Sequence, residues 1–147
     1  YPYMGFKELE KIIEKIKKNS GGILLIDYGY VQSKNENTLQ SVKNHKRNDL
    51  LSNLGKADIT SLVNFKLLDE FFSTKNLKVK NIVSQSFFLK KLGIVERANN
   101  ISKKMQFTQK ADLYLRMKRL LDPRTMGNLF KVIFAYKAKK NNFVGFD

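Results

Sequence analysis

The run GGILLIDYGY, residues 21–30, constrains the fold of this chain more than any other segment. Ile23 to Ile26 are continuously apolar, which is typical of a strand covered on both faces by helices, whereas a strand with one solvated face alternates. We therefore predict a fully buried strand in an α/β sheet. In open α/β sheets, ligands bind beyond the carboxyl ends of the strands, and this strand brings Asp27, Tyr28 and Gly29 to that place.

A purely structural interpretation of the same residues competes with the functional one. The Asp27 carboxylate can cap a turn, and Gly29 can supply a positive φ. The segment by itself leaves both interpretations open.

Composition limits the class of protein. A chain of 147 residues with 42% hydrophobic content fits one folded domain. The chain has no cysteine, which excludes disulfides and thiolate metal sites. No apolar run approaches the length that spans a bilayer, and the first ten residues lack the pattern of a signal peptide. We therefore expect a soluble domain without a membrane span.

The positive charge is concentrated in the C-terminal half. Residues 75–147 carry 17 Lys and Arg against 4 Asp and Glu, whereas residues 1–74 carry 11 against 9. Such a surface can attract nucleic acid, acidic protein or anionic membrane. The lysines are dispersed among helical apolar positions and form no aromatic-interleaved stripe, so nucleic acid is the least favoured partner.

Apolar spacing predicts an amphipathic helix ahead of the buried strand. Phe6, Leu9, Ile13 and Ile16 recur at helical intervals, and residues 19–22 are suited to end the helix in a short turn. A helix that leads into a buried strand is half of a βαβ unit. The first strand of that unit is expected upstream of Tyr1.

A polar segment follows the strand. Residues 30–57 show no sustained period and are predicted to be a long loop. Long loops in compact domains are often functional, so this one is a candidate lid, with a poorly ordered surface insertion as the alternative.

The rest of the chain reads as a helix, a strand, a helical segment and a last strand. The pattern predicts a helix from Asp58, capped by Asp58 or Thr60, and a short strand over 77–83. Residues 86–122 are predicted to be a helical insertion in two pieces, which Asp122 and Pro123 end. The apolar run 129–136 predicts a final strand, and we expect it to close the sheet in the antiparallel direction.

Metal and phosphate chemistry find little support in the residues. His45 is the only histidine, and neither cysteine nor a paired-carboxylate spacing accompanies it, so we expect no metal site. His45 stays a candidate acid, base or hydrogen-bonding group, or a solvated loop residue. The pair Gly21 and Gly22 is too short for a dinucleotide fingerprint, and no Walker sequence occurs.

Several spaced segments together carry a family resemblance. They are GGILLIDYGY, NTLQSVKNHKRNDLL, GKADITSLVNF, SQSFFLKKLGIVERA and MGNLFKVIF. In order and spacing they resemble the C-terminal half of the MidA family. These are class I S-adenosylmethionine-dependent methyltransferases that include the mitochondrial protein arginine methyltransferase of complex I assembly.

The resemblance implies an α/β fold that is the C-terminal part of a Rossmann-like methyltransferase sheet, with a helical insertion before the last strand. The family's S-adenosylmethionine site lies in its N-terminal half, so the cofactor belongs to the complete enzyme and this chain alone is expected to be inactive. The implied partners are a complex I subunit as substrate and a missing N-terminal half or a second copy. The implied location is the cytoplasm in a bacterium and the mitochondrial matrix in a eukaryote.

The resemblance also suggests roles for individual residues. Asp27 and Asp58 would orient or neutralise an acceptor guanidinium, because methyl transfer needs an aligned acceptor more than a strong base. Tyr28 and His45 are the other catalytic candidates and would form part of the wall of the acceptor pocket. The substrate-binding candidates are Gly29, Thr60, Gln85 and Phe88. The alternative is a non-catalytic interaction or assembly module that lacks the cofactor site.

Overall fold

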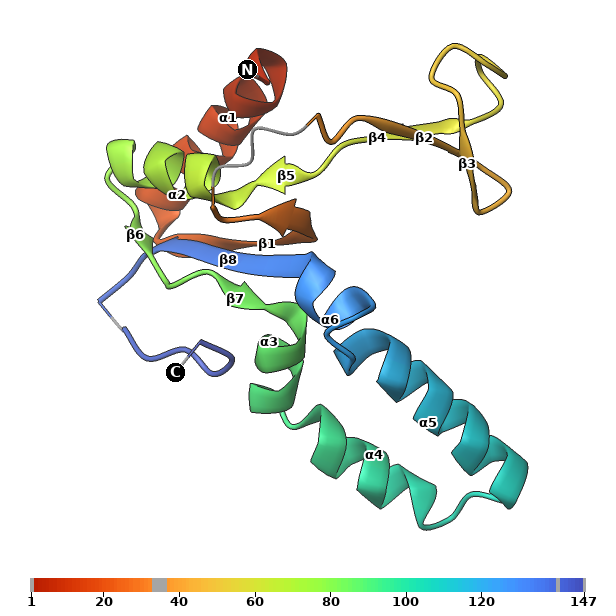
Figure 1. Ribbon diagram of the computed structural model, residues 1–147. Coiled ribbons are helices and arrows are strands. Elements are labelled where there is room, and N and C mark those ends of the chain that lie inside the picture. The colour runs from red at the N-terminus through yellow and green to blue at the C-terminus, as the bar shows by residue number, and fades with distance from the viewer. Residues whose placement is uncertain (1, 33–36, 140, 147) are drawn as a thin grey trace.

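Helices cover one face of a mixed sheet, and a helical arm and a small second sheet extend from it (Figure 1). The computed structural model describes residues 2–32, 37–139 and 141–146. The order of strands in the main sheet is β5-β1-β8-β6, and β7 also pairs with β8. The prediction of an α/β fold is confirmed.

The centre of the main sheet is an antiparallel pair formed by β1 (Gly21–Tyr30) and β8 (Phe130–Lys137). Its register runs from Gly21 opposite Lys137 to Tyr28 opposite Phe130. The prediction that the last strand closes the sheet in the antiparallel direction is therefore confirmed. The short strands are β5 (Val63–Asn64), parallel to β1, and β6 (Lys78–Val79) and β7 (Val83–Ser84), both antiparallel to β8.

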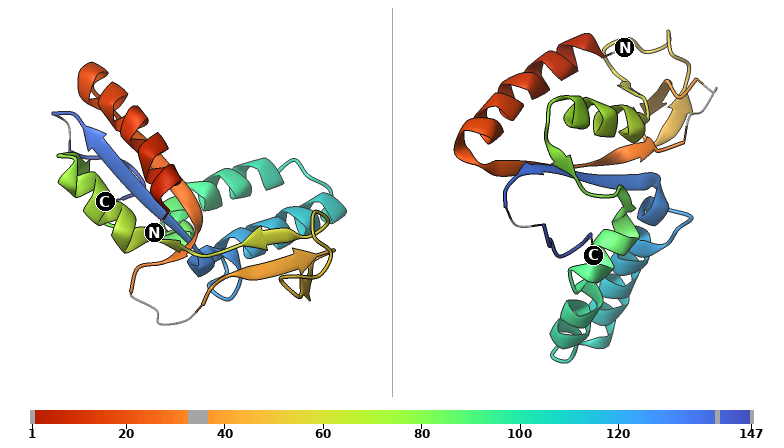
Figure 2. Two further views of the ribbon diagram at one scale, coloured as in Figure 1. Left: turned by 90° about the horizontal axis from the view of Figure 1, so that it is seen from above. Right: turned by 90° about the vertical axis from the view of Figure 1, so that its left-hand side faces the viewer.

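The hydrophobic core lies between this sheet and two helices, α1 (Tyr3–Asn19) and α2 (Phe65–Thr74). Ile13 of α1, Phe65 and Phe72 of α2, and Ile133 of β8 are fully buried. The predicted first helix is confirmed, and it ends where Ser20 adopts a positive φ of 55°. Both helices lie on the same side of β1 and β8 (Figures 1 and 2).

The prediction that β1 is fully buried is wrong. Leu24, Ile26 and Tyr28 are 44%, 45% and 40% exposed, whereas Ile23 and Leu25 of the same strand pack against the core. The physical reason is that α1 and α2 cover one face only. Alternate side chains of a strand point to opposite faces, so every second apolar residue of β1 reaches the uncovered face.

The polar segment 30–57 is not a continuous loop. It contains β2 (Gln40–Lys43) and β3 (Lys46–Asn48), which form a hairpin, and β4 (Asp58–Thr60) pairs with the other edge of β2. Asn44 and His45 form the two-residue turn with φ values of 51° and 60°, as hairpin turns of this type require. Residues 33–36 of the predicted lid lie outside the described residues.

The predicted caps of the second helix are also wrong. Asp58 and Thr60 belong to β4, and the α2 helix begins later, where the Asn64 side chain accepts a hydrogen bond of 3.1 Å from the backbone N–H of Leu67. The strand predicted over 77–83 is divided into β6 and β7.

A helical arm connects β7 to β8 along the chain and points away from the main sheet (Figures 1 and 2). It consists of α3 (Gln85–Lys91), α4 (Ile94–Ser102), α5 (Phe107–Leu121) and α6 (Met126–Leu129). The prediction of two helical pieces over 86–122 is wrong, because the chain is interrupted twice and α3, α4 and α5 all fall in this range. One interruption is at Gly93, whose φ is 79°, and the other lies between α4 and α5. Asp122 and Pro123 end α5, as the sequence predicts.

Candidate functional site

A groove lies where the small sheet meets the carboxyl end of β1. We call it the hairpin groove; its volume is about 550 Å³. Tyr28 of β1 contributes to its wall together with residues of the small sheet and with Leu62 and Leu129. The hairpin groove therefore occupies the position at which open α/β sheets place their ligands.

One face of the small sheet supplies the polar side chains of the groove. Arg47 and Asp58 stand opposite Val42 on either side, and Gln40 stands opposite Thr60. Paired residues of neighbouring strands share a face, and so do residues two apart in one strand. This register explains why all five of these residues line the same groove.

Tyr28 is fixed in the wall by an aromatic neighbour. Its ring lies 4.5 Å from the ring of Phe130, centroid to centroid, at the paired position of β8. Tyr28 remains 40% exposed, so its hydroxyl can meet a ligand while its ring is held. Aromatic pairs in such a tilted arrangement are favourable beyond the area they bury.

The hairpin groove presents charges of both signs. Asp58 and Arg47 are exposed, with Val42 between them in the strand register. In the described part of the chain, Asp58 and Arg47 do not form an ion pair with each other. A carboxylate here can accept charge-assisted hydrogen bonds from a cationic ligand, and a guanidinium can bind an anionic group beside it.

Asp27 lies away from Asp58. Its neighbour Tyr28 lines the hairpin groove, and strand alternation directs Asp27 to the other face of the sheet. The Asp27 Oδ1 atom accepts a hydrogen bond of 2.7 Å from the backbone N–H of Tyr28. The structure thus does not bring the two predicted carboxylates into one groove.

Gly29 has a packing role that is visible in the structure. A Cβ atom at this position would lie 2.5 Å from Cδ2 of Phe65 and would also meet the backbone oxygen of Val63. Gly29 lines a second groove, of about 620 Å³, together with Tyr30 and Arg124. Leu62 and Leu129 line both grooves, which places the two side by side.

Three further predicted residues lie elsewhere. His45 is exposed in the turn of the β2–β3 hairpin and does not line the hairpin groove. Gln85 is buried at the start of α3, where its Nε2 donates a hydrogen bond of 3.0 Å to the backbone oxygen of Leu120. Phe88 is buried too, with its ring 5.3 Å from that of Phe146.

Sequence reasoning missed several groove residues, among them Gln40, Val42 and Arg47. The polar residues of this segment hide the strand period, so the sequence predicts a loop there. Gln40 and Val42 share one face of β2, as Asp58 and Thr60 share one face of β4, but strands this short show no clear alternation of apolar and polar residues.

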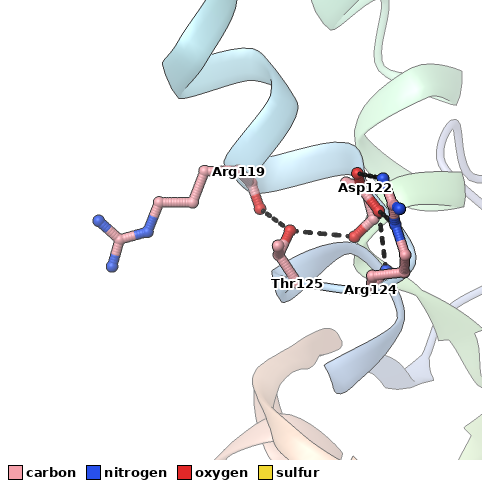
Figure 3. A network of polar contacts seen from close by, with 4 residues as sticks. All are labelled: Arg119, Asp122, Arg124 and Thr125. Atoms are coloured by element: carbon pink, nitrogen blue, oxygen red, sulfur yellow. Dashed lines mark hydrogen bonds and ion pairs between the residues drawn. The ribbon is translucent and has the colours of Figure 1, made fainter. Parts of the chain in front are cut away.

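A hydrogen-bonded turn lies at the base of the helical arm (Figure 3). Its residues Arg124 and Thr125 also line the second groove. Arg124 donates from Nε to Oδ1 of Asp122 at 3.2 Å and from Nη2 to Oδ2 at 3.0 Å. Thr125 donates from its hydroxyl to the backbone oxygens of Arg119 and Asp122. The hydrogen bonds from Arg124 lower the pKa of the Asp122 carboxyl to about 2.

The glycines of the chain do not form an open cradle for a ligand. At the four most enclosed positions, protein atoms already fill the space that a Cβ would take; these are Gly22, Gly29, Gly127 and Gly145. At Gly5, Gly21 and Gly55 the space is open, but these residues lie in separate elements. The described residues therefore do not fit a phosphate- or nucleotide-type glycine loop.

Two absences concern the described part of the chain only. Its His, Asp and Glu residues form no group of three or more that could hold a metal ion. Its helices include none with the length and hydropathy needed to cross a bilayer.

The curated relatives of this chain are protein arginine methyltransferases. The mitochondrial protein arginine methyltransferase NDUFAF7 of Danio rerio is 28% identical over 123 residues, which are 84% of this chain and 29% of that protein. The human NDUFAF7 protein is 30% identical over 129 residues, 83% of this chain and 27% of that protein. This chain thus spans less than a third of the length of these relatives.

Two solved structures from Burkholderia thailandensis share the fold. An uncharacterised protein has a TM-score of 0.79 at 22% identity, over 91% of this chain and 39% of that one. A second protein, with bound S-adenosyl-homocysteine, has a TM-score of 0.72 at 25% identity, over 86% of this chain and 34% of that one.

A family match identifies the chain. Residues 5–83 match the model of a family of S-adenosyl-L-methionine-dependent methyltransferases. The match includes β1 and all the residues of the small sheet. Because it covers more than half of the chain, we conclude that the chain belongs to this S-adenosyl-L-methionine-dependent methyltransferase family, as its resemblance to MidA proteins predicts.

Proposed function

We propose that this chain supplies the acceptor-binding part of a protein arginine methyltransferase. The observation that carries the proposal is the hairpin groove, where Tyr28, Asp58 and Thr60 meet at the carboxyl end of β1 in a chain of the methyltransferase family. The names of the relatives support arginine as the acceptor.

The groove residues suit the binding of a guanidinium. Asp58 would accept charge-assisted hydrogen bonds from two of its nitrogens, and Thr60 and Tyr28 offer hydroxyls on the same wall. Leu62 and Leu129 would exclude water from the acceptor nitrogen. Such alignment and desolvation account for much of the rate that an enzyme adds to a transfer reaction.

The remaining predicted residues enter the proposal differently. Because the Asp27 side chain lies on the other face of the sheet, it would act on the acceptor only through the electrostatic field of its carboxylate near the end of β1. Gly29 would contribute by allowing Phe65 to pack closely. We assign no contact with the acceptor to His45, Gln85 or Phe88.

We propose that S-adenosylmethionine is bound mainly by protein outside these 147 residues, so that this chain alone does not methylate. The lack of an open glycine cradle supports this division, and so does the fraction of the relatives that the chain spans. No described strand pairs with the second edge of β1 before Gly29. That edge and the exposed Leu24 and Ile26 would receive the missing part of the enzyme or a second copy.

The substrate and location follow the resemblance. We propose a subunit of respiratory complex I as the methylated protein, with the mitochondrial matrix as the location in a eukaryote and the cytoplasm in a bacterium. The mitochondrial names of the relatives support the first of these locations.

A non-catalytic interaction module is the second candidate function. The uncovered face of β1 and the lack of an open glycine cradle favour it. It differs from the first candidate in that no form of the protein would transfer a methyl group.

One experiment separates the two candidates. The polypeptide encoded by the natural gene, with all sequence that flanks these residues, is incubated with methyl-labelled S-adenosylmethionine and complex I subunits, and methylarginine is measured by mass spectrometry. We expect methylarginine with this polypeptide and none with residues 1–147 alone. Absence of methylarginine from every form would contradict the first candidate and favour the second. Tight calorimetric binding of S-adenosylmethionine to residues 1–147 would contradict the proposed division of the cofactor site.

A further inference from the structure

The helical arm carries a third groove, which the proposed methyl transfer does not use. This arm groove, with a volume of about 800 Å³, lies between α4 and α5. Neither helix has a buried residue, although each presents apolar side chains at helical spacing. Val95 and Ala98 come from α4, and Leu113, Met117 and Leu121 come from α5.

The arm groove has the length of a short helix. Its lining along α5 runs from Lys110 to Leu121, which corresponds to about 17 Å at the rise of an α-helix. Two neighbouring helices with an apolar furrow between them are completed by a third helix that packs its own ridge into the furrow. A segment with apolar residues at i, i+3 or i+4, and i+7 matches that length.

The charge around the groove selects the kind of helix. Residues 85–125 contain ten Lys and Arg against three Asp and Glu. Two of those acids already pair within the arm, Asp112 with Arg116 at 2.9 Å and Asp122 with Arg124 at 3.0 Å. Lys110 and Lys118 line the groove itself, together with the paired Asp122 and Arg124, so the lining carries a net positive charge.

The chain's described C-terminal segment does not fill this groove. Phe143 and Phe146 pack against the ring of Phe134, with centroids 4.8 and 5.8 Å away, and Phe146 also contacts Phe88. The segment therefore lies against β8 and α3. At the base of the arm, Gln85 joins α3 to α5 through its hydrogen bond to the backbone oxygen of Leu120.

We propose that the arm groove binds an acidic amphipathic α-helix of a partner protein. Leucine-type side chains would fill the furrow between Val95, Leu113 and Met117, and glutamates or aspartates would face Lys110 and Lys118. Nucleic acid fits the apolar side chains of the lining less well than its positive charge: Tyr114 is aromatic, but the other apolar side chains are aliphatic or Met117, whereas single-strand binding surfaces stack successive bases on several aromatic rings. The proposal does not rest on the methyl-transfer function, because the arm groove shares no lining residue with the hairpin groove.

The test uses a synthetic probe and the full 147-residue chain. An 18-residue peptide with leucines at helical spacing and glutamates on the other face is labelled, and its binding is followed by fluorescence anisotropy. One control peptide carries lysine in place of each glutamate, and another has the same composition in scrambled order. We expect saturable binding of the acidic helix and at least about tenfold weaker binding of both controls.

Two variants connect binding to the groove. K110E combined with K118E is expected to weaken the binding of the acidic peptide about tenfold or more and to strengthen the binding of the lysine peptide. Met117→Ala combined with Leu113→Ala is expected to weaken the binding of the acidic peptide by a similar factor. Far-ultraviolet circular dichroism checks that each variant keeps its helices, and Leu115→Ala, at an exposed position outside the groove lining, is the matched control.

Several results would overturn the proposal. These are equal binding of acidic and basic peptides, or folded variants that bind as the parent does. A single-stranded oligonucleotide that binds the parent tightly and displaces the peptide would assign the groove to nucleic acid. A dimer in sedimentation that Met117→Ala with Leu113→Ala abolishes would assign it to a second copy.

Discussion

Arg124 holds Asp122 by two parallel hydrogen bonds, from Nε to Oδ1 at 3.2 Å and from Nη2 to Oδ2 at 3.0 Å. The backbone N–H of Arg124 donates a third, of 2.9 Å, to the same Oδ1. These bonds lie in the turn between α5 and α6 (Figure 3), and α6 leads directly into β8. They also lie between the arm groove and the second groove, whose linings both include Arg124.

This ion pair predicts an acid-dependent contribution to stability. The pKa of Asp122 is lowered from 3.8 to about 2, chiefly by the hydrogen bond from Arg124. A carboxyl whose pKa is lower in the folded state stabilises that state above its unfolded pKa, and the effect is lost as the pH falls through the folded value. Asp122→Asn should therefore lower the unfolding midpoint at pH 7, and the difference from the parent should shrink between pH 3.8 and about 2.

Thermal unfolding across pH measures that difference. Asp112→Asn is the matched control, because its pair with Arg116 is exposed on both sides, at 60% and 75%, and such pairs contribute about 0–1 kcal/mol. A difference that persisted unchanged below pH 2 would contradict the assignment of the effect to the Asp122 carboxylate.

Gly29 should tolerate no side chain. The Cβ of Gly29→Ala would meet the Phe65 ring and the Val63 backbone oxygen, and overpacking of this kind costs about 1–3 kcal/mol. We expect urea unfolding to show that loss in the free energy of unfolding. Gly21→Ala, where nothing lies within 4 Å of the added Cβ, should unfold close to the parent; a comparable loss there would remove the packing explanation.

The core between α2 and the sheet should depend on Phe72. This residue is fully buried, so Phe72→Ala should lower the free energy of unfolding by about 3–5 kcal/mol through lost burial and the cavity left behind. Phe107→Ala removes the same atoms from a side chain that is 85% exposed and should have little effect in the same urea titration. Equal losses for the two variants would be inconsistent with the core described here.

Elements whose apolar pattern extends over many residues could be predicted from the sequence. Short elements, or elements whose pattern is masked by polar residues, could not. The helix α1 could be predicted because apolar residues recur at helical spacing over several turns, as at Phe6, Ile13 and Ile16. The apolar run before Asp27 predicts the strand β1 but not how exposed it is. Continuous apolar residues do not reveal whether this chain covers one face of the strand or both. The hairpin strands are three and four residues long, too short for alternation to stand out among polar residues.

The candidate site could be predicted only in part. Tyr28, Asp58 and Thr60 line one groove, and their roles in binding the acceptor stay a prediction. The sequence places Asp27 with them because it follows the apolar run at the carboxyl end of the strand, but adjacent strand residues point to opposite faces. Arg47 could not be foreseen, because its place in the groove depends on the register of β3 against β2.

The placement of Asp58 leads to the most direct test of the proposed function. Asp58→Asn keeps the shape of the side chain but removes the charge that would hold a guanidinium. The variant is made in the polypeptide encoded by the natural gene, and Asp69→Asn, on α2 outside the hairpin groove, serves as the control.

The decisive measurement is the steady-state rate of methyl transfer to protein arginine by the parent and by these two variants. The account predicts that Asp58→Asn lowers kcat/KM for the arginine acceptor by about a hundredfold, the scale of one lost electrostatic contact. The KM for S-adenosylmethionine should stay the same, and Asp69→Asn should match the parent. An unchanged kcat/KM for the acceptor in Asp58→Asn would contradict the claim that the hairpin groove binds the acceptor.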